Sequence, residues 1–154
     1  MVAAALGALF APFVVYFFGH VRVTDSSWVK AVVAKESFTA NVRIIHAYAK
    51  SKDMDPRLKD LANELGKLSF SGYSLIDEAL LEMEIGSVDH MQLPTGEWIG
   101  LKALDISADR KLKLEVEIDK LRTTVVIESG STRIVDGPAM NGESLILAIT
   151  RSKE

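Results

Sequence analysis

The spacing of hydrophobic and polar residues divides the chain into two parts. Residues Val2 to Gly19 form one run without any Asp, Glu, Lys or Arg. After this run, hydrophobic and polar residues alternate over most of the sequence, and every charged side chain lies there. As a helix, the run would span roughly 27 Å, close to the thickness of the hydrocarbon core of a bilayer. We therefore expect a transmembrane anchor at residues 1–20.

Two other interpretations of this run remain open. A cleaved signal peptide has the same length, but the run lacks a basic region before it and an Ala-x-Ala site near its end. A buried helix of a soluble core is disfavoured by Gly7, Pro12 and Gly19. His20 follows the run directly, and we interpret it as a residue of the membrane–water interface.

Two arguments give opposite answers for the side of the membrane on which the domain lies. Arg22, Lys30 and Lys35 follow the run, and the positive-inside rule would place them in the cytoplasm. A single N-terminal anchor ahead of one compact domain more often exports that domain. We therefore expect the domain on the extracytoplasmic, periplasmic side.

The next segments predict a stalk, a strand and a helix. Residues 21–36 are either a juxtamembrane stalk or a short helix through Trp28 to Lys35. Phe38 to Tyr48 alternates with period two, which predicts a strand with His46 on its apolar face. Asp55 then caps the clearest helix of the chain, and Pro56 occupies its first position. This helix has an apolar stripe at helical spacing and ends at Gly66.

Alternation with period two returns after this helix. It predicts strands at Phe70–Leu75, Ala79–Ile85, Trp98–Ile106, Leu112–Ile118, Thr123–Glu128, Thr132–Val135 and Leu145–Ile149. Ser129-Gly130-Ser131 is interpreted as the turn of a hairpin, and Gly137-Pro138 and Asn141-Gly142 as parts of a loop. Leu145–Ile149 is apolar throughout, which is typical of a central strand covered on both faces.

These elements predict the fold class and the domains. We expect an α+β, mostly β chain: an N-terminal transmembrane helix, then one β-rich, sandwich-like domain at residues 37–154 with one clear α-helix.

Composition excludes several classes of function. The 154 residues are 48% hydrophobic and 25% charged, which is typical of a globular protein. Lys and Arg number 18 against 21 Asp and Glu, so a nucleic-acid partner that requires clustered cations is not expected. The chain has no cysteine, which excludes disulfides, thiol catalysis and Cys-ligated metals.

Histidines are the first candidates for chemistry. On the apolar face of a strand, His46 is more often structural than a ligand. His90 follows Asp89, but neighbours on a strand point to opposite faces. The sequence has no His-Glu-x-x-His pair. An enzyme that pairs His46 or His90 with a carboxylate stays open as a third hypothesis.

Carboxylate pairs and one apolar group also have simple structural interpretations. Asp53 and Asp55 supply too few oxygens for a cation site, and capping explains Asp55. Glu82 and Glu84 share a strand face that alternation predicts to be solvated. One apolar group near a turn is expected to pack in the core rather than form an exposed patch; its members are Met91, Leu93, Trp98 and Ile99. We assign no catalytic, cofactor-binding or metal-ligating residue.

One stretch carries a resemblance to a known family. From Thr124 to Pro138 the chain reads as an apolar strand, a Ser-Gly-Ser turn, a second apolar strand and Asp136-Gly137. This order resembles the hairpin of secretin-type proteins of the bacterial cell envelope, in which Gly-Gly replaces Asp-Gly. The start of the domain is similar to the small periplasmic N-domains of those proteins. The resemblance implies a place in envelope machinery and carries over no functional residue.

The leading functional hypothesis is a non-enzymatic, membrane-anchored, extracytoplasmic interaction or assembly domain of a bacterial envelope complex. Its partner would be another protein or copies of itself, bound through sheet edges or an apolar patch. The alternative is a secreted or periplasmic carrier that holds a small apolar ligand between its sheets. Neither hypothesis requires a cofactor.

Overall fold

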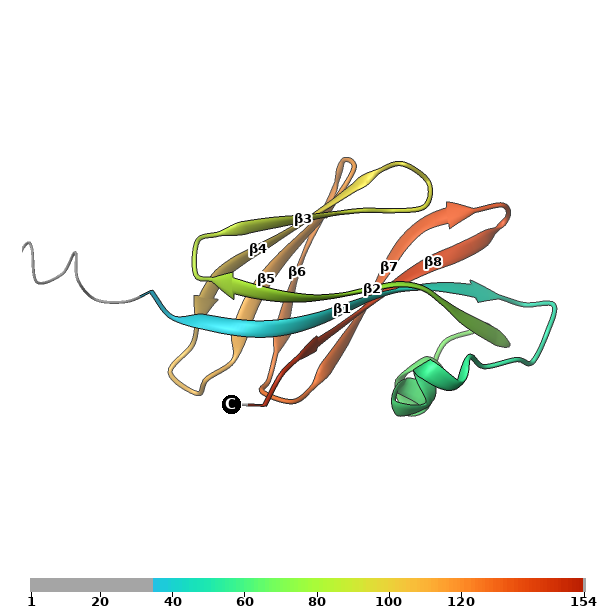
Figure 1. Ribbon diagram of the computed structural model, residues 1–154, viewed down its shortest axis with the longest axis horizontal. Coiled ribbons are helices and arrows are strands. Elements are labelled where there is room, and N and C mark those ends of the chain that lie inside the picture. Colours follow the sequence, from blue (N-terminus) through green and yellow to red (C-terminus); the bar gives the residue numbers. More distant parts are fainter. Residues whose placement is uncertain (1–34, 154) are drawn as a thin grey trace, which may run out of the picture. The chain divides into compact units, whose positions relative to one another are not determined.

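The computed structural model describes residues 35–153, which form two antiparallel sheets of four strands each, one over the other (Figure 1). Sheet A has the order β2-β1-β8-β7, and sheet B has the order β3-β4-β5-β6. The strands are β1 Ser37–Tyr48, β2 Gly72–Glu84, β3 Val88–Gln92, β4 Trp98–Ile106, β5 Leu112–Ile118, β6 Leu121–Ile127, β7 Thr132–Met140 and β8 Glu143–Arg151. The predicted mostly-β, sandwich-like fold is confirmed.

The predicted membrane anchor, residues 1–20 with His20, lies outside the described residues. The short helix predicted from Trp28 also lies outside them, apart from Lys35 at its end. Across the described range, 35–153, no helix has both the length and the apolar character needed to span a membrane.

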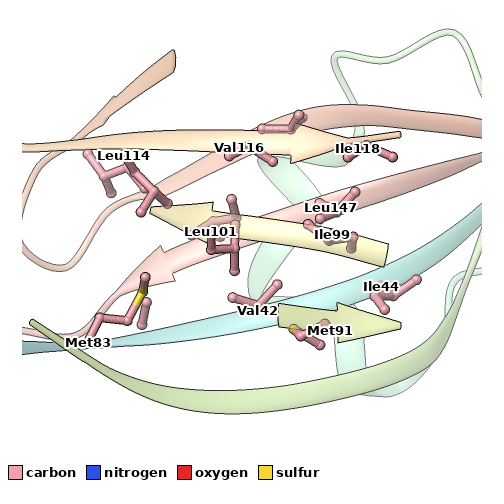
Figure 2. Close-up of a cluster of buried hydrophobic side chains, with 14 of the residues drawn as sticks. Val42, Ile44, Met83, Met91, Ile99, Leu101, Leu114, Val116, Ile118 and Leu147 are labelled. Atoms are coloured by element: carbon pink, nitrogen blue, oxygen red, sulfur yellow. The ribbon is translucent and has the colours of Figure 1, made fainter. Parts of the chain in front are cut away.

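The main core lies between the inner faces of the two sheets, where alternate residues of each strand interdigitate (Figure 2). Val42 and Ile44 of β1 and Leu147 of β8 contribute from sheet A, and Ile99 and Leu101 of β4 from sheet B, all with no exposed surface. Because side chains alternate between the two faces of a strand, the remaining residues of each strand form the outer face of its sheet.

A second, smaller core covers part of the outer face of sheet A. The chain between β1 and β2 forms a 3-10 helix, η1 (Pro56–Leu61), followed by the short α-helix α3 (Ala62–Leu65). Their Leu58, Leu61 and Leu65 are buried against outer-face residues of β1 and β8. Both faces of β8 are therefore covered, which confirms the prediction of a two-sided central strand at Leu145–Ile149.

The predicted helix is confirmed in position but not in type. Asp55 caps it, since its Oδ1 accepts a hydrogen bond from the backbone N–H of Arg57 at 3.0 Å. The pKa of Asp55 lies well below its usual range. The main cause is the hydrogen bond from the Arg57 guanidinium, and the bond from the Arg57 backbone N–H adds to it. The first six helical residues are 3-10, so the α-helical part is only the four residues of α3.

Two of the predicted strands are one strand in the structure. Ile44 and Ile45 of β1 pair with Asp77 and Leu75 of β2, which leaves Ile76 as the extra residue of a bulge. The bulge reverses the phase of alternation, so Leu75 packs under the helical segment whereas Met83 packs in the main core. The irregular phase around Ile76 makes one long strand look like two. Strand β3 was not predicted.

The predicted hairpin at Ser129–Ser131 is wrong. Strand β6 pairs with β5 in sheet B, whereas β7 pairs with β8 in sheet A. This turn therefore carries the chain from one sheet to the other. A glycine turn between two apolar strands has the same sequence pattern whether the strands pair or separate, so alternation alone does not distinguish the two cases. The stretch that resembles the secretin hairpin thus spans both sheets.

The loop predicted from two dipeptides is confirmed as a turn at Asn141-Gly142 but is wrong at Gly137-Pro138. These residues lie inside β7, where the pairing with β8 shifts between Asp136 and Ala139. The reversal comes later, at Asn141 and Gly142, whose φ values of 53° and 80° form a tight two-residue turn. Proline is tolerated in β7 because this strand lies at the edge of sheet A.

Candidate functional site: the outer face of sheet B

The outer face of sheet B holds a hollow of about 630 Å³, which we call the sheet B hollow. The strand register places its lining residues. Across the middle of the sheet, His90 of β3 lies opposite Gly100 of β4, which lies opposite Glu117 of β5. Glu117 in turn lies opposite Arg122 of β6. One side chain is missing from this row, at Gly100, and the gap deepens the hollow at its centre.

The backbone does not require glycine at position 100. Its φ lies outside the left-handed region, and a Cβ there would meet Glu117 Cβ at 3.8 Å and the His90 ring at 3.9 Å, which is ordinary contact. Gly72 differs, because a Cβ there would lie 2.0 Å from Tyr48 Cε2. Glycine inside a strand weakens it. The gap at Gly100 is therefore a feature of the surface rather than a demand of the fold.

Trp98 forms one wall of the hollow and corrects the sequence prediction. It was expected in the core with Met91, Leu93 and Ile99, and those three are buried. The side chain of Trp98 is 58% exposed. Because Ile99 points into the core, its neighbour Trp98 points out of the sheet. Val88, a second exposed apolar residue, lines the same hollow.

Charged residues of both signs surround these apolar walls. Arg122 pairs with Glu117 at 2.9 Å and with Glu115 at 3.8 Å, so these three charges compensate one another in part. Glu97 and Asp119 also line the hollow, and within residues 35–153 neither has an ion-pair partner. Four carboxylates thus face two cations around the hollow, Lys102 being the second cation. The excess of negative charge makes the site unsuitable for phosphate or nucleic acid.

A second hollow of about 330 Å³ lies where β5, β6 and β7 approach one another. Core-facing Val116 and Ile118 line it together with Pro138 of the β7 bulge. Leu121, the first residue of β6, also lines it and is 77% exposed. This hollow is more apolar than the sheet B hollow and opens beside the main core.

Part of the outer face of sheet A is occupied by internal contacts. Arg43 binds Asp60 of η1 through Nη1 at 2.8 Å and Glu78 of β2 through Nε at 3.0 Å. The pKa of Arg43 is raised, mainly because its guanidinium donates a hydrogen bond to Asp60. Hydrogen bonds from Asn41 and then Arg43 lower the pKa of Glu78. This network fastens η1 to the sheet beside the second core.

The structure separates the two histidine candidates. His46 Nε2 lies 2.5 Å from Glu143 Oε2, and its ring lies 5.4 Å from that of Tyr48. His46 therefore does have a carboxylate neighbour, at the end of β8 and away from both hollows. His90 lines the sheet B hollow, whereas Asp89 belongs to the opposite face of β3.

The carboxylate pairs keep their structural interpretations. Asp53 accepts a hydrogen bond from Ser51, and Asp55 caps η1. Glu82 and Glu84 are exposed on the outer face of β2. Across the part of the chain that the structure describes, no group of three His, Cys, Asp or Glu side chains could hold a metal ion.

Sequence reasoning missed the sheet B hollow although a signal for it is present. In the stretch Trp98-Ile99-Gly100-Leu101-Lys102, the buried residues are Ile99 and Leu101. The alternate positions therefore place Trp98, Gly100 and Lys102 on the solvent face. A large aromatic residue and a glycine on the wet face of one strand are the signal.

The chain matches no protein-family model, no curated protein and no solved structure.

Proposed function

We propose that this chain is a non-enzymatic interaction domain, held at the membrane by its N-terminal apolar run, that binds a partner protein through the outer face of sheet B. The exposed indole of Trp98 beside the sheet B hollow is the observation that carries this proposal. Tryptophan in a pocket is the residue type most enriched at the energetic centres of protein interfaces. Val88 widens the apolar contact, and the surrounding charges supply a polar rim.

The location of the domain rests on sequence. The uncharged run from Val2 to Gly19 supports a transmembrane anchor. The periplasmic side is proposed because a single N-terminal anchor ahead of one compact domain more often exports that domain. The proposed place in a bacterial envelope complex rests on the order of residue types at 124–138, which resembles a secretin-type hairpin in sequence although its two strands lie in different sheets. Membrane fractionation and protease treatment of spheroplasts, with a C-terminal tag on the full chain, test the anchor and the side of the membrane on which the domain lies. A tag that pellets with membranes and is cut from outside agrees with the proposal, whereas a tag protected from protease puts the domain in the cytoplasm.

Site-specific photo-crosslinking tests the proposed contact surface. A photoreactive amino acid replaces Trp98 in the full chain, expressed in cells. The same amino acid in place of Leu80, which is 70% exposed on the outer face of sheet A, is the matched control. We expect a discrete adduct with another protein from position 98 and none from position 80. Equal labelling from both positions, or an adduct only between copies of this chain, would contradict the proposed partner surface.

A second candidate function is a carrier of a small apolar ligand. The observation that favours it is the 330 Å³ hollow beside the main core, with Val116, Ile118 and the exposed Leu121 around it. An apolar ligand there would cover Leu121 and lie beside Glu97, Asp119 and Arg122, which also line the sheet B hollow. Native mass spectrometry of the intact protein tests this function. A co-purifying lipid that is lost in Leu121→Asp, but kept in Leu80→Asp, would favour the carrier.

A further inference from the structure

We infer that the sheet B hollow binds a cationic side chain of the partner, an arginine, whose guanidinium lies against the indole of Trp98. This inference rests on the proposed function, because it names the chemistry of the partner at the same face. It is drawn from the depth of the hollow at Gly100, from the carboxylates without an ion pair near Trp98, and from the distance of Trp98 from Lys102.

The missing side chain at Gly100 gives the hollow room for one inserted side chain. The cross-strand neighbours His90 and Glu117 lie on either side of this position, and Trp98 and Lys102 lie before and after it on β4. Side chains of alternate residues on one strand are roughly 7 Å apart, so the gap between Trp98 and Lys102 is about twice that length. A long, unbranched side chain can lie in such a gap, along the direction of the strand.

The charges favour a cation at the Trp98 end of the gap. Ile99 pairs with Ile118, so Asp119, the next residue of the chain, lies beside Trp98. Glu97 lines the same end, and within the described residues neither carboxylate has an ion-pair partner. A guanidinium on the indole face would gain a cation–π contact, and its five N–H donors suit nearby carboxylates. An anionic group would be repelled there.

Lys102 does not cancel this preference. It lies four residues from Trp98 along β4, which corresponds to about 13 Å in an extended strand. The screening length at physiological ionic strength is about 8 Å, so the repulsion between Lys102 and a cation at Trp98 is weak. Lys102 also lies opposite Glu115 in the register of β4 and β5. The near carboxylates therefore outweigh the distant ammonium.

The test uses two peptides on the full chain in mild detergent. The chain has two tryptophans, so Trp28→Phe leaves the Trp98 indole N–H as a single signal for nitrogen–proton NMR. One peptide carries a central arginine between glycines and serines, and the other carries citrulline, a neutral analogue of the same shape. We expect the arginine peptide to shift the Trp98 signal with a dissociation constant about tenfold lower than that of the citrulline peptide, an advantage that high salt reduces.

Three variants locate the binding. Gly100→Leu fills the gap and should raise the dissociation constant of the arginine peptide to that of the citrulline peptide. Backbone amide signals of sheet B measure this binding. Trp98→Ala should have the same effect without filling the gap. Val126→Ala is the matched control, because Val126 is 43% exposed on sheet B but does not line the hollow. This control should bind as the parent does, and thermal unfolding establishes that each variant is folded.

Two results would overturn the inference. Equal binding of both peptides would show that charge does not select the ligand. A larger shift of the Trp98 signal with a neutral oligosaccharide such as chitotriose would indicate a sugar site instead.

The peptide and crosslinking results separate the two proposals. A partner captured from position 98 without any arginine preference would retain the interaction domain and reject the arginine. An arginine preference without capture of another protein in cells would reject the protein partner and retain the chemistry of the hollow.

Discussion

The two sheets of this sandwich share one core but differ in what covers their outer faces. In sheet A, residues such as Ile45 and Ile146 lie under the helical segment and are fully buried. In sheet B, Trp98 and Val88 remain in contact with solvent around a hollow. Apolar outer-face residues under the helical segment thus stabilise the fold in sheet A. Leu80 of sheet A is exposed but lines neither hollow, whereas Trp98 and Val88 of sheet B line a hollow and are available to a ligand. The same strand alternation produces both surfaces, and the helical segment decides which one is closed.

The largest expected difference between the two faces is in stability. Leu58→Ala removes a fully buried side chain from the second core and should lower the free energy of unfolding by about 2–5 kcal/mol, from lost burial and the remaining cavity. Trp98→Ala removes a larger side chain from an open surface and should cost less than about 1 kcal/mol. Chemical denaturation of both variants measures the contrast, and equal losses would contradict it.

A smaller effect of opposite sign is expected at Gly100. Gly100→Ala should stabilise the fold by about 0.5–1 kcal/mol, because the added Cβ finds ordinary contacts and the unfolded chain loses freedom. Gly72→Ala in sheet A should destabilise it, since the new Cβ would overlap the Tyr48 ring and lie 2.7 Å from Ser51 O. The sign of each change can be read from the midpoint of urea unfolding. A destabilising Gly100→Ala would mean that the backbone itself requires glycine there.

The smallest expected effect is a dependence on pH that comes from sheet A. Hydrogen bonds from Asn41 and Arg43 lower the folded-state pKa of Glu78 below its usual 4.5. Below pH 4.5 the unfolded chain binds this proton more readily than the folded one. The stabilising contribution of Glu78 is therefore complete above about pH 4.5 and is lost as the pH falls through the folded-state pKa.

Glu78→Gln should remove this part of the acid sensitivity. Thermal unfolding at pH 3 and pH 6 measures it, and the loss between the two should be smaller in the variant than in the parent. Glu82→Gln is the control, because Glu82 is exposed on the same strand and has no partner in the Arg43 network. A control with the same reduction would mean that general charge, rather than the network, causes the effect.

Local patterns predicted the strands well but not their partners. The alternation of Leu112 to Ile118 and the apolar run Leu145–Ile149 each gave the correct strand and the correct faces. The bulge at Ile76 and the crossover at Ser129–Ser131 were missed, because both depend on which distant strand lies alongside. Pairing is a property of two segments, and one sequence records only the tendencies of each.

The candidate site was less predictable than the fold for the same reason. Trp98 was placed in the core because it is large and apolar, although the phase set by Ile99 and Leu101 points it outwards. The assembly of His90, Gly100 and Glu117 into one row requires the register of three strands. That register becomes visible only once the sheet is known.

The crossover between the sheets also bears on whether the protein stays dispersed. Strand β6 lies at the edge of sheet B, and the edge of a sheet presents backbone groups with which a strand of another molecule can pair. Just after the crossover, Arg133 Nε of β7 donates a hydrogen bond to Val126 O of β6 at 2.7 Å. This hydrogen bond gives one backbone acceptor of the edge strand a partner within the same molecule. A backbone acceptor that already binds a side chain of its own chain is less open to an edge strand of another molecule.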